Sequence, residues 1–157
     1  MHLYLEFDAI VRRFAEEHVR YAVAGALAVA LHGFLRNTED IDILVGHEDL
    51  ERASGILKAM GYQSSSAPWT FKDTQITLWR FIKPDRNSEE LMVVDVMVPE
   101  SPEGQAILDR SVTVAYADLT LRVVGRDDLI AMKRARNSAL DKADIEKIKG
   151  NGTDEAV

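Results

Sequence analysis

The 157-residue chain contains no cysteine, and this absence excludes disulfides, zinc–thiolate sites and cysteine nucleophiles. It also lacks an apolar run near the roughly 20 residues that a membrane-spanning helix needs. Its first twenty residues carry four acidic side chains, which argues against a secretory signal or a transit peptide. No Gly-x-x-x-x-Gly-Lys run occurs, so a nucleotide-binding loop of the Walker type is excluded. These absences predict a cytoplasmic protein without a membrane partner.

Positive charge is also scarce, because 19 Lys and Arg residues stand against 26 Asp and Glu residues and the net charge is −7. Bulk electrostatics therefore do not favour a long nucleic-acid partner. The apolar fraction of 46% and the length are typical of one soluble domain with a hydrophobic core. We expect a single domain over residues 1–149 and a flexible tail over residues 150–157.

Apolar periodicity and turn residues divide the chain into alternating helices and strands. Helices are expected at residues 4–18, 26–31, 47–60, 102–110, 127–137 and 140–149. Strands are expected at residues 21–24, 40–45, 91–98, 112–115 and 121–124, with one or two more within 70–83. The order is not a regular βαβ alternation, so it predicts an α+β fold with a mixed central sheet flanked by helices.

Two aspartates, Asp40 and Asp42, stand in the apolar strand "DIDILV". Alternate residues of a strand point to the same face, so both carboxylates project together while Ile41 and Ile43 point to the other side. Two carboxylates at this spacing can bracket one divalent ion, and oxygen ligands suit Mg²⁺ or Mn²⁺. An Asp-x-Asp pair also occurs by chance, and the alternative is simply a polar strand end.

A third carboxylate, Asp95, lies at the centre of the apolar run "MVVDVMV". A carboxylate in such a strand must be neutralised, paired or coordinated. It is a third metal ligand if its strand lies beside the strand of Asp40 and Asp42, since neighbouring strands are about 4.8 Å apart. The alternative is an ion pair with an arginine.

A glycine turn, Gly25-Ala26, links the strand at 21–24 to the following helix. Small residues there let a phosphate approach the backbone amides at the helix start, although a tight turn alone would also need them. The residues between this turn and Asp40 fit one short helix and a return loop, which predicts that turn and carboxylates lie at the same end of the sheet. An anion cradle beside three carboxylates fits nucleotidyl transfer with divalent metal ions.

The stretch "GALAVALHGFLRNTEDIDILV" resembles the nucleotidyltransferase superfamily of the DNA polymerase beta type, whose signature is Gly-Gly or Gly-Ser, a spacer and Asp-x-Asp. It is most similar to small bacterial nucleotidyltransferases of the abortive-infection and toxin–antitoxin kind, which share a closing segment like "LIAMKRARNSALDKADIEKI". The resemblance implies a nucleotidyltransferase fold. It implies Asp40, Asp42 and Asp95 as metal ligands and catalytic residues, with Mg²⁺ or Mn²⁺ as cofactor. The chain departs from the signature at Ala26, which keeps the small size but has no hydroxyl.

The resemblance also implies a nucleotide-binding set that comprises Gly25, Ala26, Arg36, Thr38 and Lys133. Arg36 would clamp the triphosphate, and its alternative is a solvated loop arginine. Thr38 would donate to a phosphate or cap the turn. Lys133 would face the nucleotide or lie on a solvated basic face.

The expected reaction is metal-dependent transfer of a nucleoside monophosphate from an NTP, such as ATP, to the hydroxyl of a tRNA, a protein or a small molecule. A toxin–antitoxin role is one setting for it. One alternative is a catalytically silent binding module or antitoxin with the same fold. Another is an antibiotic nucleotidyltransferase, whose cationic acceptor suits the net charge of −7, but whose usual helical acceptor domain has little room after Gly125.

Overall fold

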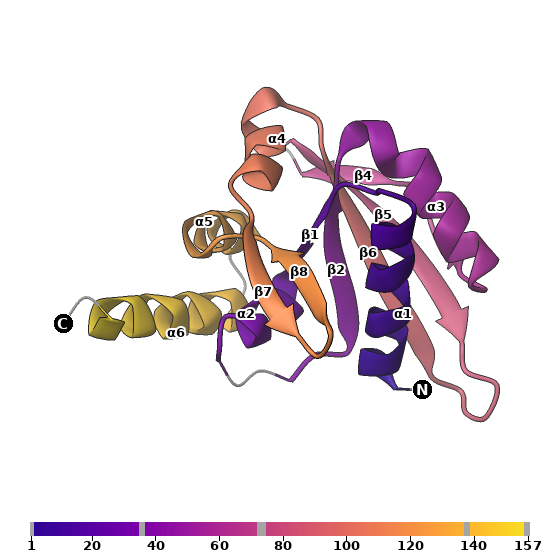
Figure 1. Ribbon diagram of the computed structural model, residues 1–157, viewed down its shortest axis with the longest axis horizontal. Helices are drawn as coiled ribbons and strands as arrows, with labels where there is room; N and C mark the ends of the chain where they lie inside the picture. The colour runs from indigo at the N-terminus through magenta and orange to yellow at the C-terminus, as the bar shows by residue number, and fades with distance from the viewer. Residues whose placement is uncertain (1, 35–36, 72–74, 137–138, 156–157) are drawn as a thin grey trace.

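The computed structural model describes residues 2–34, 37–71, 75–136 and 139–155. Within them a sheet is flanked by helices (Figure 1). The α-helices are α1 (Leu3–Glu16), α2 (Gly25–Leu31), α3 (Leu50–Ala59), α4 (Pro102–Asp109), α5 (Arg126–Arg136) and α6 (Ala139–Glu155), and the 3-10 helix η1 (His47–Asp49) precedes α3. The strands are β1 (Tyr21–Ala24), β2 (Asp40–Val45), β3 (Gln63–Ser64), β4 (Trp69–Phe71), β5 (Ile76–Pro84), β6 (Leu91–Pro99), β7 (Val112–Tyr116) and β8 (Leu119–Val123).

The strands form one sheet in the order β3-β5-β6-β2-β1-β8-β7, with β4 paired to β5. The pairs β2–β6 and β1–β8 are parallel, whereas β1–β2, β5–β6 and β7–β8 are antiparallel. The mixed sheet of the predicted α+β class is therefore confirmed. Strands β2 and β6, which carry the aspartates of the apolar strands, are direct neighbours.

Helix α1 covers one face of this sheet (Figure 1). It buries Phe7, Ile10, Val11 and Phe14, which follow the helical period. Its Glu6 accepts a hydrogen bond from Lys83 Nζ at 2.8 Å. Lys83 is three residues from Arg80 in the continuous strand β5, so the two side chains point to opposite faces. The face that carries Arg80 is therefore the one that α1 leaves uncovered.

Two elements differ from the sequence prediction. Strand β3 was not predicted, because its two residues are exposed and give no apolar signal. Helix α6 extends to Glu155, beyond the end at residue 149 that the sequence predicts for it. None of the helices in the described residues has both the length and the apolar character needed to cross a membrane.

Candidate active site

Four neighbouring strands place a row of partnered residues across the face of the sheet opposite α1. Arg80 on β5 is the register partner of Asp95 on β6, Asp95 is the partner of Asp42 on β2, and Asp42 is the partner of Ala24 on β1. Register partners point to the same face of a sheet, with strands about 4.8 Å apart. The structure therefore brings Asp42 and Asp95 side by side, and Asp40 lies two residues further along the same face.

Burial increases along this group of carboxylates. Asp40 is exposed, Asp42 is half-buried, and Asp95 is only 4% exposed. On the opposite face Ile41 and Ile43 are completely buried. Strand β2 thus has one core face and one carboxylate face, as its alternating sequence predicts. The three carboxylates run from the solvent edge of the sheet toward its interior.

The glycine turn lies directly against Asp42. Gly25 has a φ of +61°, and a Cβ built on it would lie 2.0 Å from Asp42 Oδ2. No side chain other than hydrogen fits there, because Cβ atoms do not approach other heavy atoms within 3.0 Å. Ala24, at the N-cap of α2, makes no side-chain capping hydrogen bond. The predicted proximity of turn and carboxylates is therefore present in the structure, and Gly25 is required by conformation and by space.

Arg80 neutralises the buried carboxylate. Its Nε donates to Asp95 Oδ1 at 2.8 Å and its Nη2 donates to Asp95 Oδ2 at 2.9 Å. The guanidinium carbon also lies 5.6 Å from the ring centroid of Trp69 on β4. The hydrogen bonds to Asp95 raise the pKa of Arg80, burial lowers it, and the negative charges of Asp95, Asp40 and Asp42 raise it further. Arg80 is thus close enough to interact electrostatically with all three carboxylates.

The sequence leaves open which arginine would pair with Asp95. A signal for it was present, because Arg80 is the one charged residue in the apolar run "ITLWRFI" at residues 76–82. A lone cation in one apolar strand and a lone anion in another compensate each other when the strands pair. Only the register between β5 and β6 turns this signal into a contact.

The side chains of the site show whether it has the ligands that a divalent metal ion needs. Asp40 and Asp42 present carboxylate oxygens on one face, which is the chemistry that Mg²⁺ and Mn²⁺ prefer. Asp95 adds a third carboxylate, but both of its oxygens are held by Arg80. In the part of the chain that the structure describes, no three acidic or histidine side chains are grouped as they would be around a metal ion. The residues fit one divalent ion at Asp40 and Asp42, whereas Asp95 already has a cationic partner, Arg80, at both of its oxygens. The predicted metal role of Asp95 stays a prediction.

The other predicted nucleotide-binding residues lie in different settings. Thr38 donates from Oγ1 to the backbone carbonyl of Asp40 at 2.9 Å, so it fixes the entry into β2. Ala26 follows Gly25 in the first turn of α2 and is partly exposed. Arg36 lies outside the described residues. The predicted contacts of these residues with a nucleotide remain predictions.

Lys133 lies in a buried ion cluster between α5 and α6. It is 4% exposed, and its Nζ donates to Asp144 Oδ2 at 3.0 Å and lies 3.6 Å from Asp141 Oδ1. Both aspartates are buried. The alternative that Lys133 lies on a solvated basic face is therefore wrong, because its ammonium group is buried and paired with two carboxylates. A contact between Lys133 and a nucleotide would require this cluster to open.

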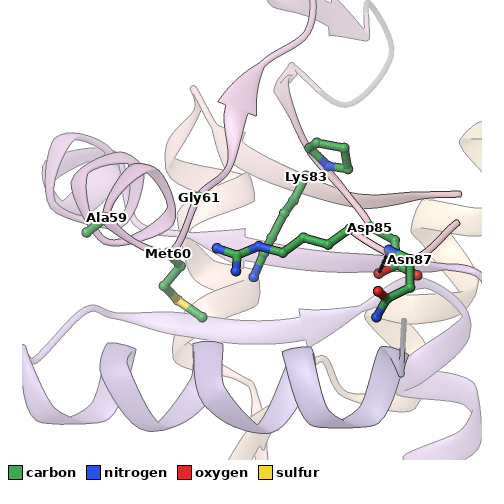
Figure 2. A pocket seen from close by; sticks show the side chains of 8 residues that line it. Ala59, Met60, Gly61, Lys83, Asp85 and Asn87 are labelled. Carbon is green, nitrogen blue, oxygen red and sulfur yellow. Dashed lines mark hydrogen bonds between the residues drawn. The ribbon is translucent and has the colours of Figure 1, made fainter. Parts of the chain in front are cut away.

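A surface pocket of about 600 Å³ lies elsewhere, between the end of α3 and the turn from β5 to β6. Figure 2 shows Met60 and Gly61 on one side of it and Asp85 and Asn87 on the other. Its lysine, Lys83, is hydrogen-bonded to Glu6 and points to the face opposite Arg80. This pocket is therefore separate from the carboxylate row, which remains the candidate active site.

The comparisons with known proteins identify the family of the chain and the proteins that share its fold. The model of a family described as "Uncharacterised nucleotidyltransferase" matches residues 1–132. No curated protein matches the chain by sequence. Among solved structures, the lincomycin-bound lincosamide antibiotic adenylyltransferase LnuA has a TM-score of 0.62 and 19% identity, over 92% of this chain and 94% of that chain.

Two further structures are similar to the same extent. A putative nucleotidyltransferase from Thermotoga maritima has a TM-score of 0.63 and 18% identity, over 95% of this chain and 93% of its own. ANT(2″)-Ia in complex with adenylyl-2″-tobramycin has a TM-score of 0.62 and 12% identity, over 94% of this chain and 87% of its own. At these identities the likeness shows that the fold is shared.

Proposed function

Because the chain belongs to the nucleotidyltransferase family whose model spans residues 1–132, we propose that it transfers a nucleoside monophosphate from an NTP to an acceptor hydroxyl at the carboxylate row. The observation that carries this proposal is the register of Asp42 with Asp95, together with Gly25 packed against Asp42. Two carboxylates side by side on neighbouring strands cost free energy, because like charges repel each other. A metal ion that binds with a triphosphate would offset this cost.

Each residue of the row receives a role. Asp40 and Asp42 would hold Mg²⁺ or Mn²⁺, which offsets the negative charge of the triphosphate and makes the α-phosphorus more electrophilic. The backbone amides at Gly25 and Ala26 would receive phosphate oxygens, since only small side chains stand there. Asp95 would accept the proton of the acceptor hydroxyl.

The proposed reaction is a substitution at the α-phosphorus. The acceptor oxygen forms a bond to the α-phosphorus, and the bond from that phosphorus to the oxygen bridging the α- and β-phosphates breaks. Pyrophosphate leaves with the bonding electrons, and the hydroxyl proton passes to the Asp95 carboxylate. Asp95 accepts hydrogen bonds from Arg80 through both oxygens, and each oxygen keeps a further lone pair for the proton.

The acceptor is a tRNA, a protein or a small molecule. The sequence suggested that the helical acceptor domain usual in antibiotic nucleotidyltransferases has little room after Gly125, and the described residues there form the two helices α5 and α6. LnuA, named as a lincosamide antibiotic adenylyltransferase, is matched over 94% of its own length. The length of this chain is therefore compatible with a small antibiotic acceptor. Lincomycin and tobramycin are included among the acceptors to be tested.

The experiment follows the label of the NTP. The protein is incubated with Mg²⁺ and with ATP labelled at either the α- or the γ-phosphate, in the presence of total tRNA, lincomycin, tobramycin or cell lysate. We expect label to pass to an acceptor from the α-phosphate and not from the γ-phosphate, and Asp42→Asn to abolish the transfer. Transfer from the γ-phosphate would contradict the proposed chemistry.

A toxin–antitoxin setting and a catalytically silent module make different predictions for the same protein. In a toxin–antitoxin system the product of an adjacent gene would be the acceptor or the inhibitor of the transfer. If the chain is a silent module, neither the natural protein nor its Ala26→Gly and Ala26→Ser variants will bind nucleotide with any divalent metal. We expect both variants to bind nucleotide at least as well as the natural chain, because each restores a residue of the signature.

A further inference from the structure

The third carboxylate of the row already has a cation that the protein supplies. Arg80 holds both oxygens of Asp95, at the position where the resemblance to known nucleotidyltransferases placed a metal ion. We infer that Arg80 takes the place of a second metal ion, so that this nucleotidyltransferase binds one divalent ion with its NTP, at Asp40 and Asp42. The inference rests on the proposed function of the row.

The guanidinium group is fixed from two sides. Its two hydrogen bonds to Asp95 are parallel and charge-assisted, which is the strongest geometry between these side chains. The ring of Trp69 lies 5.6 Å from the guanidinium carbon, within the range of cation–π contact. Strand β4 carries Trp69 and pairs with β5, which carries Arg80, so the sheet itself positions both. A metal ion at Asp95 would lie beside a guanidinium group that is already fixed in place, and the two positive charges would repel each other.

Burial favours the arginine over an ion that must arrive from solution. Asp95 is 4% exposed, and Arg80 approaches it from the neighbouring strand of the same sheet. A carboxylate that is buried when the protein folds needs its counter-charge at that moment. Arg80 supplies the charge in the metal-free protein, whereas a bound ion would supply it only after loading.

The positions of the three carboxylates also agree with one ion. Asp40 is exposed and Asp42 is half-buried, so both lie nearer the solvent than Asp95 does. Asp95 lies behind them, beside Arg80. We therefore expect the metal ion at Asp40 and Asp42, and Arg80 as the cation beside Asp95.

The test counts ions and nucleotide together. Equilibrium dialysis of the protein with Mn²⁺ and α,β-methylene-ATP, which cannot transfer its nucleotidyl group, gives the Mn²⁺ and the analogue retained per chain. We expect one Mn²⁺ and one analogue per chain for the natural protein. Arg80→Gln removes the cation and should raise the count to two Mn²⁺ per chain, because Asp95 then needs a counter-ion. Arg80→Lys keeps the charge and should retain one.

A matched control is available in another arginine–aspartate pair. Arg110 donates to Asp128 through Nε at 3.0 Å and through Nη2 at 2.7 Å, outside the row, so Arg110→Gln should leave the count at one. Two Mn²⁺ per chain in the natural protein, or one in a folded Arg80→Gln variant, would overturn the inference while the proposed function stands. Retention of neither Mn²⁺ nor analogue would overturn the proposed function. If Arg80→Gln does not fold, the count of the natural protein decides.

Discussion

Gly25 and Asp42 share a space that has room for one carboxylate and no Cβ. The positive φ of Gly25 turns the chain from β1 into α2, and the missing side chain lets the Asp42 carboxylate lie over the turn. A single residue thus serves both the backbone path and the position of a proposed metal ligand. Gly33 also has a positive φ, of +99°. A substitution at Gly33 therefore measures the backbone cost without displacing Asp42, and it serves as a control for Gly25.

Gly25→Ala should cost about 1–2 kcal/mol of stability from the left-handed backbone alone and should also displace Asp42. Gly33→Ala carries a similar backbone cost, but among the described residues nothing lies within 4 Å of a Cβ built there. We expect urea denaturation to give a larger loss for Gly25→Ala than for Gly33→Ala, because only the first variant adds a clash with Asp42 to the backbone cost. Retention of α,β-methylene-ATP in the presence of Mn²⁺ should be lost in Gly25→Ala and kept in Gly33→Ala. Equal retention by both variants would contradict the role of the Gly25–Asp42 contact.

The ion pair of Arg80 and Asp95 makes a second prediction about single residues. Arg80→Gln leaves the carboxylate of Asp95 buried without its cation, and we expect a loss of about 2–3 kcal/mol. This is less than a fully buried pair would lose, because the Arg80 side chain is 38% exposed. Adding Asp95→Asn should recover more than half of the loss, since the buried charge is then gone. Additive losses in the double variant, measured by denaturation in metal-free buffer, would show that the pair is not coupled.

The candidate site was predictable where its chemistry is local. Asp40 and Asp42 share a face because they lie two apart in one strand, and Gly25 is recognisable as the turn before a helix. Arg80 was not assigned, since its pairing with Asp95 depends on the register of β5 with β6 rather than on any local pattern. Local periodicity predicts where a side chain points, but not which strand lies beside it.

Among the secondary-structure elements, α5 and α6 are joined by the buried cluster of Lys133, Asp141 and Asp144. The two aspartates are three residues apart on α6, a spacing that puts them on one face of the helix, and Lys133 of α5 pairs with both. The sequence could not tell which cation would pair, because α5 carries several. The buried position of Lys133 favours a structural contribution to this helix pair.

Lys133→Ala should therefore destabilise the protein by about 3–5 kcal/mol, the usual cost of leaving buried charges without their partner. The neighbouring Arg134 is exposed, and Arg134→Ala should change stability by no more than about 0.5 kcal/mol. Chemical denaturation of both variants gives the comparison. If Lys133→Ala kept its stability but lost Mn²⁺-dependent retention of the ATP analogue, the nucleotide-binding role predicted from the sequence would replace the structural one.

The two faces of the sheet have different roles in the molecule. Helix α1 packs on one face (Figure 1) and buries apolar side chains there. The other face carries Arg80, Asp95 and Asp42. Most elements could be predicted from the sequence, because apolar periodicity and turn residues mark them. The order of the strands could not, since the parallel pairs β2–β6 and β1–β8 join segments that are far apart in the chain. That order is what assembles the site.

The decisive measurement is the thermal stability of the protein with Mg²⁺ and α,β-methylene-ATP, each alone and both together. If Asp40 and Asp42 hold a metal-bound triphosphate, the melting temperature should rise by about 5–10 °C at an analogue concentration about 100-fold above its Kd. The rise should require both components and should vanish in Asp40→Asn. Asp118→Asn, which changes an exposed carboxylate paired with Arg12, should retain it. A rise without Mg²⁺, an equal rise in Asp40→Asn, or no rise with both components would contradict the assignment of the site.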